Sequence, residues 1–130
     1  MASPKPPSPP GVDKTLSIDE AKAIMLALYV MRPGLHQLPP DIQPLLVDFA
    51  VNSGPFVAIQ ALQECMGVSV DGVIGTETLA AATAAAAAPG TSLITALVKW
   101  RIMMVARIVR RDPMQIPFLG GWLARCLEFL

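Results

Sequence analysis

Two polar residues that share one face of a predicted helix are the first candidates for chemistry in this sequence. Asp48 and Asn52 are four residues apart, so a helix places them one above the other, beside the ring of Phe49. A carboxylate and an amide in this position either satisfy a buried partner or line a groove that contacts a ligand. A third candidate is Trp122, which can stack on a ring of a ligand or close a hydrophobic core.

Arg101 is the charged residue whose position is most informative. It lies in the longest predicted helix, which starts at Thr91 or Ser92 and ends near Arg111. At about 100° per residue, Arg101 falls on the apolar face of this helix. Four other basic residues form a stripe on its outer face: Lys99, Arg107, Arg110 and Arg111.

The predicted position of Arg101 requires a partner. A guanidinium on an apolar face needs a carboxylate or several carbonyls to offset the cost of leaving water. Asp48 is the first candidate for this partner, and Asp71 is the second. We therefore predict a structural role for Arg101, with ligand binding as the alternative.

The metal-binding residue types do not form a ligand pattern in this sequence. His36 is the only histidine, and it lies in a proline-bracketed loop without cysteine or carboxylate at ligand spacing. Cys65 and Cys126 are far apart and each lies in an apolar helical context, which favours buried free thiols over a disulfide. We expect no metal site and no cofactor.

The composition indicates one domain with a substantial core. The chain has 130 residues, of which 53% are hydrophobic. No apolar run approaches the ~20 residues that a membrane-spanning helix needs, so no membrane span is predicted. The N-terminal residues lack the apolar segment of a secretory signal. This absence predicts a protein that stays in the cytoplasm until it is released.

The charges balance overall but are unevenly distributed. Residues 91–130 carry six basic and two acidic residues. Attraction between this basic region and acidic neighbours is the plainer interpretation. The alternative is a cationic face directed at an anionic polymer such as a cell wall. The small number of aromatic residues argues against nucleic acid as the partner.

Start and stop signals predict an all-α protein, a single compact bundle of about five or six helices. Residues 1–15 are rich in proline and serine, and we expect a disordered arm that precedes a helical domain over residues 16–130. Ser17 and Glu20 form a capping box that opens a helix to about Met31. Asp41 is expected to cap a second helix, which stops at Asn52-Ser53-Gly54, and Pro55 suits the first turn of the next.

The segment between the third predicted helix and the alanine-rich fourth, which begins at Gly75 or Thr76, carries a dense set of turn residues. Asp71 can bond the amides of its own turn, and Gly72 tolerates a positive φ. Gly75 is expected to allow a close backbone approach where the fourth helix begins. These roles are conformational, so the segment defines a fold and leaves the location of any binding surface open.

A family resemblance rests on this segment and on the residues before it. Residues 62–81 contain Leu62-Gln63, Gly67-Val68, Asp71-Gly72, Gly75 and Thr78 to Ala81. This series resembles the Leu-Gln, Gly-Val, Asp-Gly, Gly, Thr-x-x-Ala series of peptidoglycan-binding domains. With residues 48–55, which end in Gly54-Pro55, the sequence is similar to the C-terminal part of phage-type N-acetylmuramidases of glycoside hydrolase family 108. The resemblance covers most of the chain after residue 16.

The resemblance implies a lysozyme-like C-terminal lobe and peptidoglycan as the partner. In similar muramidases the catalytic acid belongs to an N-terminal Glu-Gly-Gly segment, which does not occur in this sequence. Glu20, Glu64 and Glu77 have ordinary helical explanations as a cap, a solvent-facing residue and a first-turn acid. We therefore assign no catalytic residue and take Asp48, Asn52 and Trp122 as the candidate substrate contacts.

Three functions remain open from the sequence. The first is a non-catalytic peptidoglycan-binding module of an endolysin-type protein that acts at the cell wall. The second is the C-terminal half of a muramidase, completed by a catalytic segment on another chain. The third is a helical domain that makes protein–protein contacts.

Overall fold

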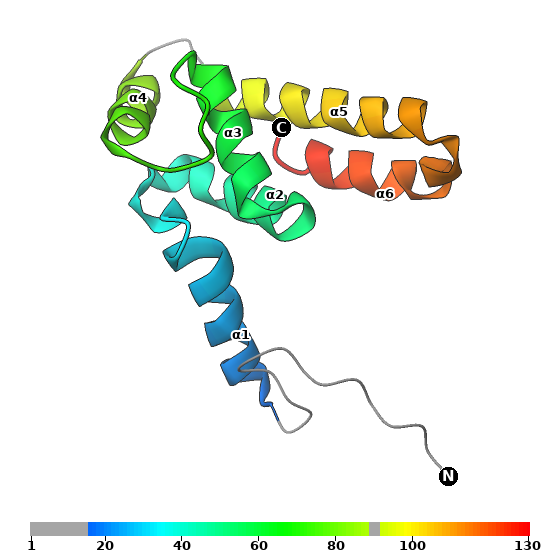
Figure 1. Ribbon diagram of the computed structural model, residues 1–130, viewed down its shortest axis with the longest axis horizontal. Helices are drawn as coiled ribbons and strands as arrows, with labels where there is room; N and C mark the ends of the chain where they lie inside the picture. The colour runs from blue at the N-terminus through cyan, green and yellow to red at the C-terminus, as the bar shows by residue number, and fades with distance from the viewer. Residues whose placement is uncertain (1–15, 89–91) are drawn as a thin grey trace.

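A computed structural model describes residues 16–88 and 92–130, and within this part every regular element is a helix (Figure 1). The α-helices are α1 (Ile18–Leu26), α2 (Gln43–Ser53), α3 (Pro55–Met66), α4 (Thr76–Ala87), α5 (Leu93–Arg111) and α6 (Ile116–Leu127). The predicted all-α class is confirmed. The arm predicted for residues 1–15 lies outside the described residues.

The core lies where α2, α3 and α5 pack together. Phe49 of α2, Leu62 of α3 and Leu97 of α5 are completely buried there. The long helix α5 carries α6 folded back along it as a helical hairpin, while α4 stands at the opposite end of the molecule (Figure 1). A short joint connects α2 directly to α3.

That joint is made by a glycine and a proline. Gly54 has φ 92°, a conformation that other residues adopt with strain, and its amide donates to the Ala50 carbonyl at 2.8 Å. Pro55 then opens α3, where its missing N–H costs no hydrogen bond. The predicted stop at residues 52–54 is confirmed.

The helix α1 projects away from the other helices (Figure 1). It begins as predicted at Ser17, whose hydroxyl accepts a bond from the Glu20 amide at 3.1 Å. It continues as a π-helical turn over Ala27–Met31, and Gly34 at φ 89° follows before the next short turn. None of the residues of α1 is buried, so this helix is held to the protein mainly through its C-terminal end.

The predicted cap at Asp41 is wrong. A short 3-10 turn, Pro40–Ile42, precedes α2, and Ile42 stands at the N-cap position without a side-chain cap. Pro44 lies in the first turn of α2 and lacks an N–H, so one fewer donor needs a cap there. The entry is held by Gln43, whose side-chain nitrogen donates to the Leu38 carbonyl at 2.7 Å.

Both cysteines are free, as predicted. Cys126 is completely buried and Cys65 is half-buried. Burial, reinforced by the Glu64 charge, raises the pKa of the Cys65 thiol to about 11, so the thiol stays protonated and unreactive at neutral pH. Among the described residues, no helix is both long and apolar enough to cross a membrane.

Candidate functional site

The loop between α3 and α4 is organised around the side chain of Gln63, which is only 1% exposed. Its amide nitrogen donates to Asp71 Oδ1 at 2.8 Å, to the Val73 carbonyl at 2.9 Å and to Thr78 Oγ1 at 3.1 Å. Its amide oxygen accepts from the backbone nitrogens of Asp71 at 3.0 Å and Gly72 at 2.9 Å. We call Gln63 and these four partners the Gln63 cluster.

Glycine is required at one position of the loop and not at another. Gly72 has φ 76°, and a Cβ atom built there would lie 2.3 Å from the Phe56 ring. The predicted positive φ at Gly72 is thus confirmed. The close approach predicted at Gly75 is wrong, because a Cβ there would meet nothing within 4 Å. Gly75 instead occupies the N-cap position of α4, which needs an extended backbone.

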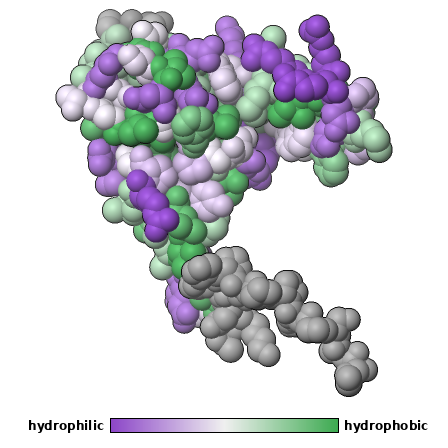
Figure 2. Space-filling model, in the orientation of Figure 1, coloured by the Kyte–Doolittle hydropathy of each residue, from purple (hydrophilic) through white to green (hydrophobic). Residues whose placement is uncertain are grey.

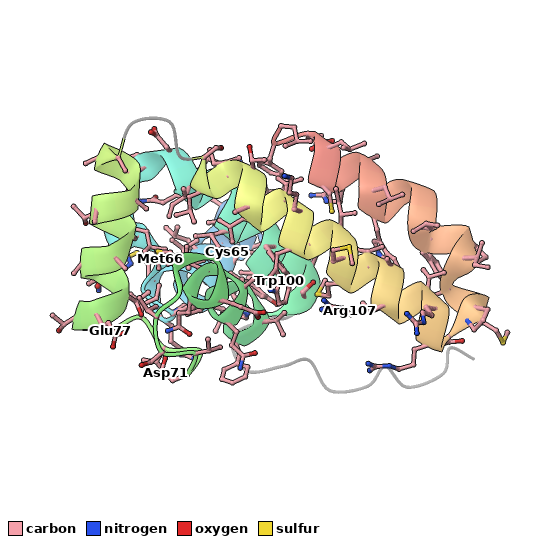
Figure 3. All side chains as sticks on the ribbon, turned by 90° about the horizontal axis from the view of Figure 1, so that it is seen from above. Cys65, Met66, Asp71, Glu77, Trp100 and Arg107 are labelled. Atoms are coloured by element: carbon pink, nitrogen blue, oxygen red, sulfur yellow. The ribbon has the colours of Figure 1, made fainter. Side chains whose placement is uncertain are left out.

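The polar groups of this loop are directed at one another. Asp71 Oδ1 also accepts from the Val73 amide at 3.0 Å, the local bond predicted for this turn. Glu77 at the start of α4 accepts from the Ser69 amide at 3.2 Å. Asp71 and Glu77 lie together at the α4 end of the molecule (Figure 3). This set of internal bonds stabilises the loop and leaves little of it available for a ligand.

A second polar cluster joins α2, α5 and α6. Arg101 is 4% exposed and donates from Nη1 to Asp48 Oδ2 at 2.7 Å, which confirms the predicted pair. Arg125 of α6 bonds the other carboxylate oxygen, Oδ1. We call these three residues the Asp48 triad. Its net charge is positive, since one carboxylate faces two guanidinium groups.

The environment of Asp48 favours its charged form. Burial alone would raise the pKa of this carboxyl, but the hydrogen bonds and charges of Arg125 and Arg101 outweigh burial and lower it. Arg101 also lies over the Phe49 ring, with its central carbon 5.0 Å from the ring centroid. Asp48 is therefore ionised at neutral pH and holds both arginines in place.

A small cleft opens beside the Asp48 triad. It measures about 100 Å³ and is lined by three polar and four largely apolar side chains: Asn52, Ser53, Arg101, Met104, Val105, Ile108 and Trp122. Asn52 is fixed by a bond from its amide nitrogen to the Asp48 carbonyl at 2.8 Å. Trp122 is half-buried, with its ring centroid 5.9 Å from that of Phe118.

The three candidate contacts from the sequence thus come together in space. Asn52 and Trp122 line the cleft directly, whereas Asp48 lies behind Arg101 and takes part through it. Arg125 was missed by the sequence analysis. Arg125 could have been found from its spacing, because it follows Trp122 by three residues and a helix places both side chains on one face. An aromatic wall, an apolar floor and a few polar groups are typical of ligand sites.

The remaining acids are dispersed over the fold. Glu64 accepts a bond from the Trp100 ring nitrogen at 3.0 Å, on the α3–α5 side of the core (Figure 3). Glu20 lies at the start of the projecting α1, and Glu77 lies in the α3–α4 loop region. Within the described residues, no three histidine, cysteine or acidic side chains are grouped to hold a metal ion.

Most of the folded part of the chain matches known protein families. Residues 57–127 match the family described as "Predicted Peptidoglycan domain". This chain belongs to that peptidoglycan domain family. Residues 8–54 match a second family, described as "Glycosyl hydrolase 108". Both matches confirm the resemblance seen in the sequence.

A solved structure supports the same assignment. The chain is similar to Brucella abortus SagA, with 28% sequence identity and a TM-score of 0.73. The likeness covers 91% of this chain and 66% of that one, so the chain spans just under two thirds of the length of SagA. No curated protein sequence matches this chain.

The peptidoglycan domain meets the hydrolase-family segment at the cleft. Asn52 and Ser53 belong to the hydrolase match, which ends at residue 54, while Arg101 and Trp122 belong to the peptidoglycan domain. The helix α1 lies wholly inside the hydrolase match. The candidate contacts therefore lie where the two matched segments pack together.

Proposed function

We propose that this chain is a non-catalytic peptidoglycan-binding module and that its cleft contacts the glycan. The observation that carries the proposal is the cleft at the junction of the two family matches, lined by Asn52, Arg101 and Trp122. Sugars present apolar ring faces edged by hydroxyl and amide groups. Trp122 offers an aromatic surface for a ring face, and Asn52 offers an amide oxygen for a donor.

The charge of the site suits this polymer. Arg101 and Arg125 outnumber the single carboxylate of Asp48, so the region beside the cleft is positive. Peptidoglycan carries carboxylates on its peptide stems, and a positive site attracts them. Binding is expected to be modest because the cleft, at about 100 Å³, is small on the scale of ligand pockets.

The same geometry argues that the chain by itself does not cleave the glycan. Ordinary glycoside hydrolysis uses a protonated carboxylic acid and a second carboxylate across the sugar. The carboxyl group beside the cleft is Asp48, and its pKa is lowered by two arginines, which is opposite to what a general acid needs. Of the described residues that line the cleft, none is acidic.

Purified sacculi provide the test. The 130-residue chain is incubated with sacculi, and both the pelleted protein and the released reducing ends are measured. We expect the protein in the pellet and no release. Trp122→Ala should weaken the affinity for sacculi about fivefold and so lower the pelleted fraction, since stacking on one ring contributes roughly 1 kcal/mol. Phe56→Ala removes an exposed aromatic ring beside Gly72 and serves as the matched control.

The outcomes separate the possible functions. Release of reducing ends would overturn the non-catalytic proposal and direct the search to Glu20, Glu64 and Glu77. Equal loss of binding in both variants would mean that the cleft is not the site. An absence of both binding and release would favour the protein-interaction alternative.

One observation favours a second function, the C-terminal half of a muramidase. The helix α1 lies in the hydrolase match and leaves apolar side chains such as Leu26 and Met25 in solvent. A helix with no buried residue gains little stability from the rest of the fold, so a further segment is expected to cover it. In an endolysin-type phage protein that segment would carry the Glu-Gly-Gly motif.

Complementation tests this second function. The product of a neighbouring reading frame that encodes a Glu-Gly-Gly helix is mixed with this chain and sacculi. Release of reducing ends by the mixture, and by neither protein alone, would support a split enzyme. Leu26→Ser should abolish that release while binding to sacculi persists. Lack of release at saturating concentrations of both proteins would reject it.

A further inference from the structure

We propose that the end of the α5–α6 hairpin binds the surface of an anionic phospholipid bilayer. This surface, called the hairpin tip, combines three exposed apolar side chains with three exposed arginines: Met114, Ile116, Phe118, Arg107, Arg110 and Arg111. It lies at the end of the molecule where α5 turns into α6, away from α4 (Figure 1). Hydrophilic and hydrophobic side chains adjoin at this end in Figure 2.

The apolar side chains of the hairpin tip are exposed, and Met114 is the most exposed large hydrophobic residue of the described part. Met114 is 83% exposed, Ile116 is 56% exposed and Phe118 is 57% exposed. They follow one another along the 3-10 turn Pro113–Gln115 and the first turn of α6. Single exposed apolar residues are common, but three of them within five residues at a protruding end are a candidate interaction site.

The turn that presents these side chains is held from within. Asp112 accepts a bond from the Met114 amide at 3.2 Å and another from the Gln115 side chain at 3.1 Å. Its carboxylate is therefore engaged in the turn. Three arginines face this one carboxylate, so the tip carries a net positive charge.

The arginines of the hairpin tip are available for an anionic partner. Among the described residues, the ion pairs are those that Arg101 and Arg125 form with Asp48. At about 100° per residue, Arg110 lies on the face of α5 opposite Arg101, and Arg107 and Arg111 lie about 120° and 80° from Arg101 around the helix. Figure 3 shows Arg107 on the part of α5 beyond Trp100.

Exposed apolar side chains beside cations select a bilayer surface over a soluble polymer. Cations attract anionic headgroups, and apolar side chains gain free energy by entering the boundary between headgroups and acyl chains. A wall polymer or a nucleic acid would use the arginines but would leave Met114 and Phe118 in water. Since no helix of the described part can cross a membrane, the contact is peripheral.

Sedimentation with vesicles tests the hairpin tip. The whole chain is mixed with vesicles of phosphatidylglycerol or of phosphatidylcholine, at low salt and at high salt. We expect binding to phosphatidylglycerol that weakens with salt, and little binding to phosphatidylcholine. Neutralising two charges with Arg110→Gln and Arg111→Gln should lower binding about tenfold or more. The pair Met114→Ser and Phe118→Ser should lower it by a similar factor.

Two matched controls use the other end of the molecule. Lys22→Gln with Arg32→Gln removes the same charge, and Met25→Ser with Leu26→Ser removes exposed apolar groups from α1. Both controls should keep vesicle binding. Equal binding to the two lipids, equal losses in tip and control variants, or no binding at low salt would overturn the proposal. A smaller oligomer in the Met114 and Phe118 variant, by light scattering, would show that a second copy covers the tip and would overturn it as well.

Discussion

The Gln63 cluster and the Asp48 triad join segments of the same small protein in different ways. The Gln63 cluster uses one amide side chain to hold a loop, and most of its bonds join groups that carry no net charge. The Asp48 triad joins three helices through full charges, and the Arg125 side chain remains 49% exposed. The polar groups of the Gln63 cluster bond to one another, whereas the Asp48 triad has an exposed side chain, Arg125, and a residue that lines the cleft, Arg101.

This difference separates a structural motif from a candidate binding site. The residues that mark the family most clearly in sequence, Gln63 and Asp71-Gly72, bond to one another. The residues that can face a ligand lie in the α2, α5 and α6 region, where the sequence pattern is less distinctive. A strong motif therefore identifies the fold here, while the contacts of the ligand have to be argued from geometry.

The largest expected effect comes from breaking the Gln63 cluster. Gln63→Leu leaves the buried Gly72 amide without its acceptor and removes the bond that the Thr78 hydroxyl accepts, at about 1–3 kcal/mol for each group. We expect a loss of about 3–5 kcal/mol in the free energy of unfolding, measured with urea. Gln60→Leu, on the same helix, should change it by under about 1 kcal/mol. Similar losses in both variants would contradict the central role of Gln63.

The charged cluster should respond asymmetrically to substitution. Asp48→Ala leaves the buried Arg101 guanidinium without its carboxylate and should cost about 3 kcal/mol. Arg101→Met removes the buried charge and should cost less, and the double variant that carries both Arg101→Met and Asp48→Ala should recover part of the loss. Thermal and urea unfolding measure these differences. If Asp48→Ala is neutral, the pair does not stabilise the fold.

A smaller effect is expected within the loop. Gly72→Ala places a methyl group against the Phe56 ring at a positive φ, for which we expect a cost of about 2 kcal/mol. The exposed Phe56 ring can move and limits the cost. Gly121→Ala in α6 meets open space and should be neutral or stabilising, by up to about 1 kcal/mol. A Gly72→Ala protein as stable as the wild type would refute the steric argument.

The smallest effect concerns pH. Asp48 and Asp71 both have a pKa below the ordinary value, Asp48 because two arginines outweigh burial and Asp71 through bonds from Val73 and Gln63. A carboxyl group whose pKa is lower in the folded state than in the unfolded state stabilises the fold at any pH above its unfolded pKa of about 3.9. This stabilisation is lost as the pH falls through the folded-state pKa. The urea concentration at the midpoint of unfolding should therefore decrease as the pH is lowered from 7 to 2. Asp48→Asn should flatten this acid dependence; an unchanged slope would mean that Asp48 does not contribute.

The features that could be predicted from the sequence are those that follow from helical periodicity and from strong stop signals. The end of α2, the start of α5 and the Arg101–Asp48 pair were all within reach, because a charge on an apolar face requires a partner. The cap at Asp41 failed because two 3-10 turns and several prolines offered another entry into α2.

What the sequence could not supply is contact between distant segments. Nothing near Gln63 in the chain indicates that its amide will reach Thr78 across a loop. Likewise, Arg125 meets Asp48 only because α6 folds back along α5, and that return depends on tertiary packing. Gly75 was misjudged for the same reason, since the space around a residue belongs to its neighbours in the fold.

The placement of the cleft across two matched segments has a thermodynamic consequence. A ligand that contacts Asn52 on one segment and Trp122 on the other binds only while the two remain docked. Mass action then couples occupancy to folding, and a ligand at about a hundred times its Kd raises the free energy of unfolding by about 2.7 kcal/mol. The melting temperature of the protein thereby becomes a gauge of occupancy, and under the proposed function cell-wall fragments compared at one concentration would be ranked by the upward shift that each produces.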